Sequence, residues 1–304
     1  MSSILTNASA LSALQSLTQT QAALNTTESQ VSSGLAVSTA ADNASYWSIA
    51  TQLNADSGVV TSANQALSQS QSVLSTASSA ISSIITTINS IESALTQAAT
   101  PGASISDIQT TLFSLGSQLQ DAVSGASFNG LNVLDGSQTT ALGFVAGFNA
   151  STTGGSINTI SFTANALIDA TTTGAGILEG GTGSATTTGT TDLLTLGGTT
   201  AAGTSAVVTD AASAKTALAG VATVLNAVTN YAATIGATQD RMTAASTFNS
   251  ALTTNYATGV SALVDADMNT ASTRLQALQT QEQLGIQSLS IANQNAQLIL
   301  KLFP

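Results

Sequence analysis

Residues 60–98 read VTSANQALSQSQSVLSTASSAISSIITTINSIESALTQA. Within this stretch, apolar or small residues recur at alternating steps of three and four positions: Val60, Ala63, Leu67, Ser70, Leu74, Ala77, Ile81, Ile84, Ile88, Ile91, Leu95 and Ala98. This heptad spacing is typical of a helix that buries one stripe of side chains against another helix. At ~1.5 Å per residue the helix is about 58 Å long, so it needs an equally long partner.

Further seams of the same kind follow along the chain. Pro101 and Gly102 end the first helix, and a second seam then runs through Ile105, Ile108, Leu112, Leu115, Leu119, Ala122 and Ala126. A weaker seam, interrupted by polar residues, runs through Ala214, Leu218, Val221, Leu225, Val228, Ala232, Ile235, Gln239, Met242 and Ser246. The sequence therefore predicts several long helices that pack along their lengths.

Both ends of the chain carry the same pattern. At the amino end the seam is Leu14, Leu17, Gln21, Leu24, Glu28, Val31 and Leu35, preceded by Leu11. At the carboxyl end it is Val264, Met268, Ala271, Leu275, Leu278, Glu282, Gly285, Leu289, Ala292, Ala296, Ile299 and Phe303. Apolar stripes at the two extremes of a chain must pair with each other or with other copies, and this favours a polymer.

The middle of the chain has a different residue pattern and composition. Residues 142–148 and 157–162 alternate with a period near two and predict a β-hairpin joined through Asn149 to Ser156. Residues 171–205 are nearly all Gly, Thr, Ala and Ser, with short apolar pieces at 177–178 and 193–194. Such a segment is too poor in large side chains to make a core of its own, and we expect a loop or a small surface insertion.

The fold class predicted from these patterns is mainly α. We expect a long, coiled-coil-like helical rod built from amino- and carboxyl-terminal segments, with a β-hairpin and a small Gly/Thr-rich central insertion. A strict 3.5-residue repeat further predicts left-handed supercoiling of the packed helices.

Charge excludes several classes of partner. Only 6% of the 304 residues are charged, against about a quarter in an ordinary globular chain. Lys and Arg total 4 against 15 acids, the net charge is −11, and the first basic residue is Lys215. Nucleic acids and anionic membrane surfaces are held by clusters of cations, so we expect neither as a partner.

The chain contains no Cys and no His, which removes the usual zinc ligands, thiol nucleophiles and the commonest general base. We expect no enzyme activity, no cofactor and no metal. Asp265, Asp267 and Asn269 resemble the start of a calcium loop, but Thr270 and Gln276 stand where Gly and a bidentate Glu are needed. A helix-terminal or hinge role fits these acids better.

Membrane insertion is not expected either. Residues 57–91 carry no charge, but about half of them are Ser, Thr, Asn or Gln in a periodic arrangement, unlike the roughly 20 predominantly apolar residues of a spanning helix. The first seven residues, MSSILTN, have neither a basic start nor a continuous apolar core. We therefore expect that any secretion uses no cleaved signal peptide.

Several segments resemble bacterial flagellin of the alphaproteobacterial type. At the amino end these are ALSAL (10–14), VSSGL (31–35) and STAADNASYWSIA (38–50). At the carboxyl end they are LVDADM (263–268), RLQALQTQ (274–281) and LSIANQN (289–295). The family usually has basic residues beside the SSGL turn, where this chain has Gln30 and Ala36. Packing between copies is therefore expected to rest on apolar seams and neutral hydrogen bonds.

The resemblance implies an extracellular structural protein that polymerises with itself into the flagellar filament used for swimming. It implies export in an unfolded state by the flagellar type III route, addition at the distal tip, and contacts with an export chaperone, a filament cap and hook-associated proteins. A hook–filament junction protein and a secreted coiled-coil adhesin are the alternatives. By the same resemblance, residues 1–45 and 260–304 would form the inner tube, residues 46–170 and 206–259 the outer tube with the hairpin, and 171–205 a variable surface insertion.

The terminal seams supply the candidate assembly residues. The expected interface consists of Leu11, Leu14, Leu17, Leu24, Val31, Leu35, Met268, Leu275, Leu278, Leu289, Ala292, Ala296, Ile299 and Phe303. Tyr46 and Trp47 lie beside a helix boundary, where aromatic residues usually anchor packing, and we expect that role for them.

Overall fold

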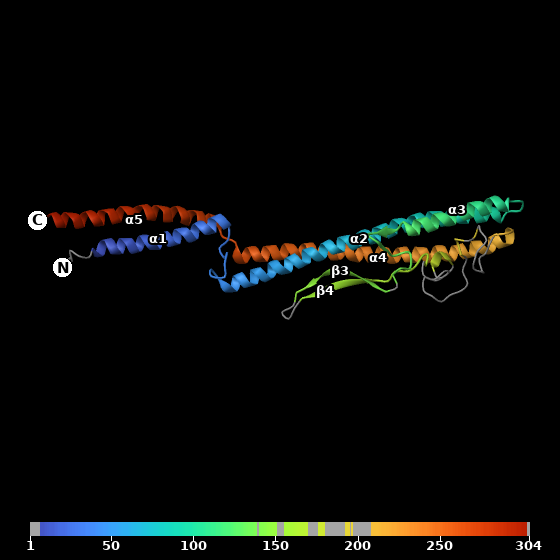
Figure 1. The fold of residues 1–304 in the computed structure, drawn as a ribbon, viewed down its shortest axis with the longest axis horizontal. Coiled ribbons are helices and arrows are strands. Elements are labelled where there is room, and N and C mark those ends of the chain that lie inside the picture. Colours follow the sequence, from blue (N-terminus) through green and yellow to red (C-terminus); the bar gives the residue numbers. More distant parts are fainter. Residues whose placement is uncertain are drawn as a thin grey trace. The chain divides into compact units, whose positions relative to one another are not determined.

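The computed structural model describes residues 7–138, 140–150, 155–169, 176–179, 192–194, 196 and 208–302, with side chains described as far as Gln294. Its elements are α1 (Ala8–Ser33), α2 (Ala44–Ala98), α3 (Ile105–Ser124), β1 (Ser127–Phe128), β2 (Leu131–Asn132), β3 (Leu142–Asn149), β4 (Ser156–Phe162), the 3₁₀ turn η1 (Ile177–Glu179), α4 (Ala211–Val264) and α5 (Met268–Leu302) (Figure 1). The predicted mainly α class with a small antiparallel hairpin is confirmed.

The chain divides into two compact units. The terminal unit consists of Met1–Ser57 and Thr254–Pro304, and the central unit of Gly58–Thr253. The predicted division at residues 45/46 and 259/260 therefore lies inside the terminal unit. Each unit combines segments from both halves of the sequence, as the seams at both ends of the chain predicted.

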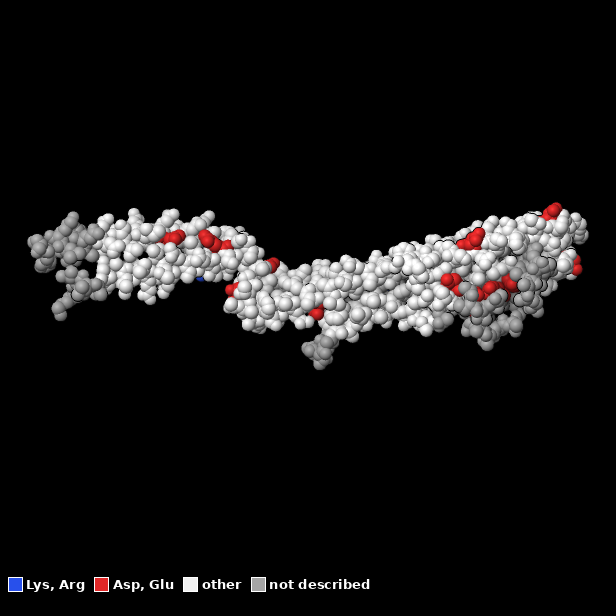
Figure 2. Space-filling model, viewed as in Figure 1, with Lys and Arg blue, Asp and Glu red and all other residues white. Residues whose placement is uncertain are grey.

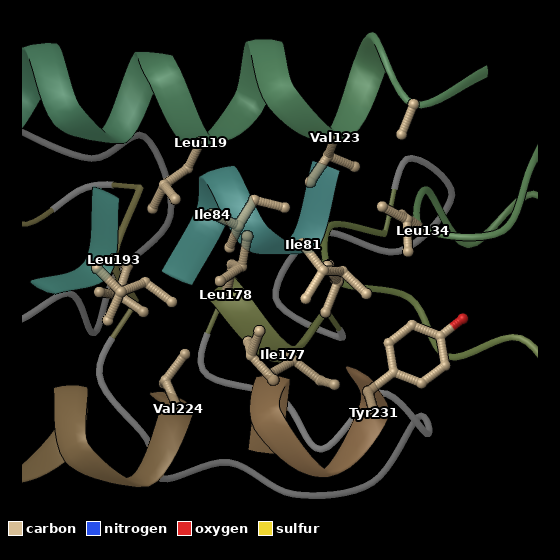
Figure 3. Close-up of a cluster of buried hydrophobic side chains, with 14 of the residues drawn as sticks. Ile81, Ile84, Leu119, Val123, Leu134, Ile177, Leu178, Leu193, Val224 and Tyr231 are labelled. Carbon is tan, nitrogen blue, oxygen red and sulfur yellow. The ribbon is translucent and has the colours of Figure 1, made fainter. Parts of the chain in front are cut away.

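The core of the central unit is organised around the predicted seam of α2. Every member of that seam is buried except Ser70, and most have no accessible surface at all. Leu112, Leu119 and Val123 of α3 pack against the same core, as does one face of α4. Figure 3 shows Ile81 and Ile84 of α2 between Leu119 and Val123 of α3 and the side chains that α4 contributes.

The buried residues of α4 match the predicted seam at alternate positions. At the positions between them, the buried residue is the one just before the predicted residue. Ala217, Val224, Tyr231 and Thr238 are buried, whereas Leu218, Leu225 and Ala232 are only partly buried. The strict alternation of three and four steps was placed one residue too far along the chain at these positions, where the core accepts Ala217, Tyr231 and Thr238. The helix is apolar and long enough to cross a membrane by length and composition alone, but Val221, Val224 and Val228 are buried in this protein core.

The Gly/Thr-rich segment contributes more to the core than expected. Ile177 and Leu178 of η1, together with Leu193 and Leu196, are buried, and Figure 3 shows the first two lying between α2 and α4. Backbone hydrogen bonds hold these pieces, from Leu178 N to Leu167 O (2.8 Å) and from Leu193 N to Leu178 O (2.9 Å). These four apolar residues are therefore core residues, which a purely surface insertion would not contain. Residues of the segment other than 176–179, 192–194 and 196 lie outside the described residues.

The predicted β-hairpin is present, and its strands end and begin at the expected residues, Asn149 and Ser156. Strands β3 and β4 pair antiparallel from Leu142 opposite Phe162 to Asn149 opposite Ser156, with an irregularity between Val145 and Gly147. The buried side chain of Asn249 on α4 donates from Nδ2 to Ala146 O at 2.9 Å. This hydrogen bond satisfies the carbonyl of the residue that the irregularity leaves without a cross-strand partner.

Tyr231 joins three parts of the central unit. Its hydroxyl donates to Val133 O (2.8 Å) and accepts from the backbone N–H of Asn165 (3.1 Å). Its ring stacks on Phe162 with centroids 6.2 Å apart, and Phe162 in turn lies 6.0 Å from Phe144. Burial of the phenol raises the pKa of Tyr231 to about 12, although the Asn165 hydrogen bond acts in the opposite direction.

Replacing Ile84 by Ala is expected to lower the free energy of unfolding by about 2–5 kcal/mol, because it removes a fully buried side chain from a close-packed seam. Denaturant titration followed by far-ultraviolet circular dichroism measures this. Ser83→Ala, one position away on the exposed face, is the control and should change stability by less than about 0.5 kcal/mol. Equal losses for the two variants would contradict the assignment of the seam.

Tyr231 is expected to make stability fall at alkaline pH. Its folded pKa, about 12, lies above the ordinary value of 10.0, so its contribution is complete below pH 10 and is lost as the pH rises toward 12. The loss should total about 2–3 kcal/mol, at ~1.4 kcal/mol per pH unit. Denaturant titrations from pH 8 to 12 would measure it. Tyr231→Phe should be less stable at pH 8 and should lack this part of the alkaline slope.

Candidate assembly interface

Helices α1 and α5 of the terminal unit lie side by side in antiparallel orientation (Figure 1). Two contacts fix their register: Asn7 Nδ2 donates to Ala292 O (3.0 Å), and Gln21 Nε2 lies 3.5 Å from Glu282 Oε1. Between them, Leu17 packs over Gly285, where an added Cβ would lie only 3.2 Å from Leu17 Cδ1. The glycine therefore permits the close approach of the two helices at this level.

The facing sides of α1 and α5 contain most of the predicted seam residues. Leu278 is buried, and the others on the two helices are half-buried: Leu17, Leu24, Val31, Leu275, Leu289 and Ala292. Leu35 is also half-buried, but it follows α1 and forms an isolated β-bridge with Asp265. Small or hydroxyl-bearing residues complete this face, including buried Thr27 and Ala271. A seam of this composition brings the two helices together while burying little apolar area.

Other apolar side chains of the two helices point to solvent. Leu11 is 73% exposed and Leu14 50%, so neither faces α5. Met268, at the start of α5, is also exposed. The half-buried residues at this end of α1 include Ala10 and Ala13, one residue before each leucine. The structure therefore brings together the middle of the predicted interface, whereas Leu11, Leu14 and Met268 are exposed in the single chain.

Helix α5 also carries exposed apolar residues outside the predicted seam. Leu284, Ile286 and Ile291 are each more than half exposed. The seven-residue spacing of Leu284 and Ile291 was the available signal, but the longer seam through Leu278 and Gly285 dominated the pattern. Ala296 and Ile299 belong to α5, but their side chains, like all of Phe303, lie outside the described residues.

A short backbone junction separates the terminal helices from the elements that adjoin them. Helix α1 ends at Gly34, whose positive φ of 73° favours glycine. Ala36 N then donates to Val264 O (2.7 Å), and Ala266 N donates to Gly34 O (2.8 Å). The ends of α1 and α4 are thereby tied together.

Asp267 begins α5 as a helix cap. Its carboxylate accepts hydrogen bonds from Thr270 Oγ1 (2.8 Å) and from the backbone N–H of Asn269 (3.0 Å), and bonds to Thr270 and Asn269 lower the pKa of Asp267. Asp265 bonds instead to the hydroxyl of Ser261. These contacts support the helix-terminal role expected for this acidic pair.

The loop before α2 is organised in a similar way. One oxygen of Asp42 accepts hydrogen bonds from the backbone and hydroxyl groups of both Ser38 and Thr39, at 2.9–3.1 Å. These bonds, led by the backbone N–H of Thr39, lower the pKa of Asp42. Asn43 then caps α2 by accepting from the N–H groups of Ser45 and Tyr46.

The expected packing role of Tyr46 and Trp47 is not what the structure shows. Tyr46 is 46% exposed and Trp47 40% exposed, and Ile49 in the same turn is 47% exposed. Residues within a single helical turn point in several directions, and the buried side of α2 here is taken by Ala50. Tyr46, Trp47 and Ile49 are therefore three exposed large side chains at the start of α2, which we together call the aromatic turn.

Comparison with known proteins agrees with this arrangement. Residues 4–139 match the family described as bacterial flagellin N-terminal helical region, and residues 218–303 match the bacterial flagellin C-terminal helical region. The chain belongs to the flagellin family. Its relatives include flagellin C of Rhizobium meliloti and a flagellin of Brucella melitensis, each 39% identical, and flagellin FljM of Caulobacter vibrioides, 34% identical. Each alignment covers 100% of this chain and 99% of the relative.

Membership in this family identifies the biological role. Flagellins are structural proteins that polymerise into the extracellular flagellar filament, so the chain is a filament subunit that associates with copies of itself. The predicted resemblance, function and extracellular location are confirmed.

The aromatic turn is expected to lose contact with water when this flagellin assembles. Trp47 is the only tryptophan in the chain, so its fluorescence reports on one position. We expect its emission maximum to move to shorter wavelength, and its quenching by acrylamide to decrease, on polymerisation. Emission and quenching that are the same in monomer and filament would show that Trp47 stays in water.

Proposed function

We propose that the terminal unit is the assembly element of the filament subunit, with each helix side serving a separate purpose. The facing sides of α1 and α5 hold the two ends of one chain together. The outward sides, with Leu11 and Leu14 on α1 and Leu284, Ile286 and Ile291 on α5, bind neighbouring copies. Exposure of these five side chains in the single chain is the observation that supports this proposal.

The magnitudes agree with association driven by apolar burial. Full burial of one Leu or Ile side chain is worth about 1.5–3 kcal/mol, while association costs at least about 4 kcal/mol in lost translational and rotational freedom. Burial of several of the five side chains therefore exceeds this cost, whereas burial of one does not. Since the first 214 residues contain no Lys or Arg, ion pairs make a limited contribution.

Export and the remaining partners complete the proposal. A terminal unit whose inner seam is rich in small and polar residues has little core of its own, and it becomes fully ordered on assembly. This suits export of an unfolded chain by the flagellar type III route, with an export chaperone, the filament cap and hook-associated proteins as partners by family resemblance. The function is structural, and we propose no catalytic activity. Coverage of 99% of the flagellin relatives favours a filament subunit over a hook–filament junction protein or an adhesin.

The double variant Leu284→Asn, Ile291→Asn tests the proposed outward face. It should raise the monomer concentration needed for seeded polymerisation at least tenfold, because two apolar contacts between copies are lost, while the helix content of the monomer stays unchanged. Sedimentation of filaments and circular dichroism of the monomer give the two measurements. The control is Gln287→Asn on the same helix, which should polymerise like the unchanged chain. Normal polymerisation of the double variant would refute this assignment of the outward face.

A further inference from the structure

Charged side chains are so few in the terminal unit that each one the structure describes can be assigned a partner or none. Its sequence holds six acids, Glu28, Asp42, Asp56, Asp265, Asp267 and Glu282, against two cations, Arg274 and Lys301. Four of the acids accept a hydrogen bond from Gln21, Gln52, Ser261 or Thr270, and Asp42 accepts several from Ser38 and Thr39. Glu28 is exposed, and its carboxylate has no hydrogen-bond or ion-pair partner among the residues that the structure describes.

Arg274 is the counterpart of Glu28 on α5. It is exposed, and its guanidinium likewise has no partner within the described part of the chain. It borders a shallow surface hollow whose other lining residues are short: Asn269, Thr270, Thr273 and Ala277. Short neighbours leave the planar guanidinium accessible to a carboxylate from outside, and arginine binds carboxylates in a two-point geometry.

The antiparallel register places these two charges at the same level of the helix pair. Leu17 packs on Gly285, and Gln21 lies beside Glu282. Seven residues after Gln21 comes Glu28, and eight residues before Glu282 comes Arg274. One terminal unit therefore carries a negative charge on α1 and a positive charge on α5 at equal height, without an ion pair between them.

From this arrangement we infer that Arg274 of one copy binds Glu28 of a neighbouring copy, with the terminal units side by side and in the same orientation. Such a contact joins two different surfaces of the same protein, and a contact of this kind repeats without limit into a ring or a helical array. Each added copy supplies one acceptor and one donor. The inference rests on the proposed role of the terminal unit in assembly, and it specifies which helix of one copy meets which helix of the next.

The ion pair would act chiefly on register. Every copy brings a net charge of −11, so close packing is opposed by repulsion between like charges, and one matched pair at fixed height favours a single axial alignment. Apolar stripes alone permit sliding by a heptad, whereas an arginine and a carboxylate do not pair after such a shift. Specific alignment is therefore the expected contribution, with a moderate gain in affinity.

Charge reversal tested with mixed subunits distinguishes a contact between copies from one within a copy. The full-length variants are Arg274→Glu and Glu28→Arg, polymerised from seeds at low salt, alone and as an equimolar mixture. Each variant alone should need about a tenfold higher monomer concentration for assembly, because a like-charge contact replaces the pair. In the mixture, copies that alternate restore opposite charges at every contact, and assembly should return to within about twofold of the unchanged chain.

Matched controls correct for net charge and folding. Arg241→Glu and Glu92→Arg make the same charge changes at exposed positions of the central unit and should have little effect, and circular dichroism verifies the helix content of every variant. If the single variants assemble normally, or if the mixture is no better than either alone, the contact between copies is refuted. Failure of the unchanged chain to form filaments would instead overturn the assembly function itself.

Discussion

Continuous burial of one stripe of α2 is the constraint on which the central unit depends. The seam from Val60 to Ala98 alternates steps of three and four without interruption, and its members are excluded from water by α3, α4 and the buried pieces of the Gly/Thr-rich segment. A stripe of this length cannot be covered by a short element, so the partner helices must be long as well. The two halves of the sequence therefore meet along α2 and α4 in this unit.

The exposed sides of these helices contact water mainly through Ser and Thr, with few charged residues. Ser and Thr hydroxyls along α2, α4 and α5 repeatedly donate to the carbonyl four residues earlier, as Thr86 does to Ser82 O and Thr229 to Leu225 O. Such bonds satisfy the hydroxyl locally but give the helix little intrinsic stability. Figure 2 shows the resulting surface, largely neutral with scattered acidic side chains on the visible face. Helices of this composition depend on the packing of their apolar stripe more than charge-rich helices do.

Periodicity predicted the parts of the structure in which only one face of the element carries large apolar residues. The α2 seam and the β3–β4 hairpin belong to this group, since Ile, Leu and Phe there alternate with small polar residues. Prediction failed where the buried residue was the smaller of two neighbouring apolar residues, as with Val224 beside Leu225 and Ala217 beside Leu218. Burial of Leu178 was also missed, because a core contact distant in sequence leaves no periodic signal in a Gly/Thr-rich segment.

The terminal unit shows why its interface was harder to predict than its helices. A helix that contacts its own chain on one side and other copies on another has two apolar stripes. When the two stripes are read together, apolar residues no longer recur at one clear helical spacing. Leu278 faces α1, while Leu284 and Ile291 do not, yet all three are large apolar residues of one helix. Assigning each stripe requires the position of α1, which only the structure supplies. Apolar area on the outward side can then provide the energy of association, and the few charges among it can determine the alignment, because burial is non-directional whereas an arginine–carboxylate pair has a fixed geometry.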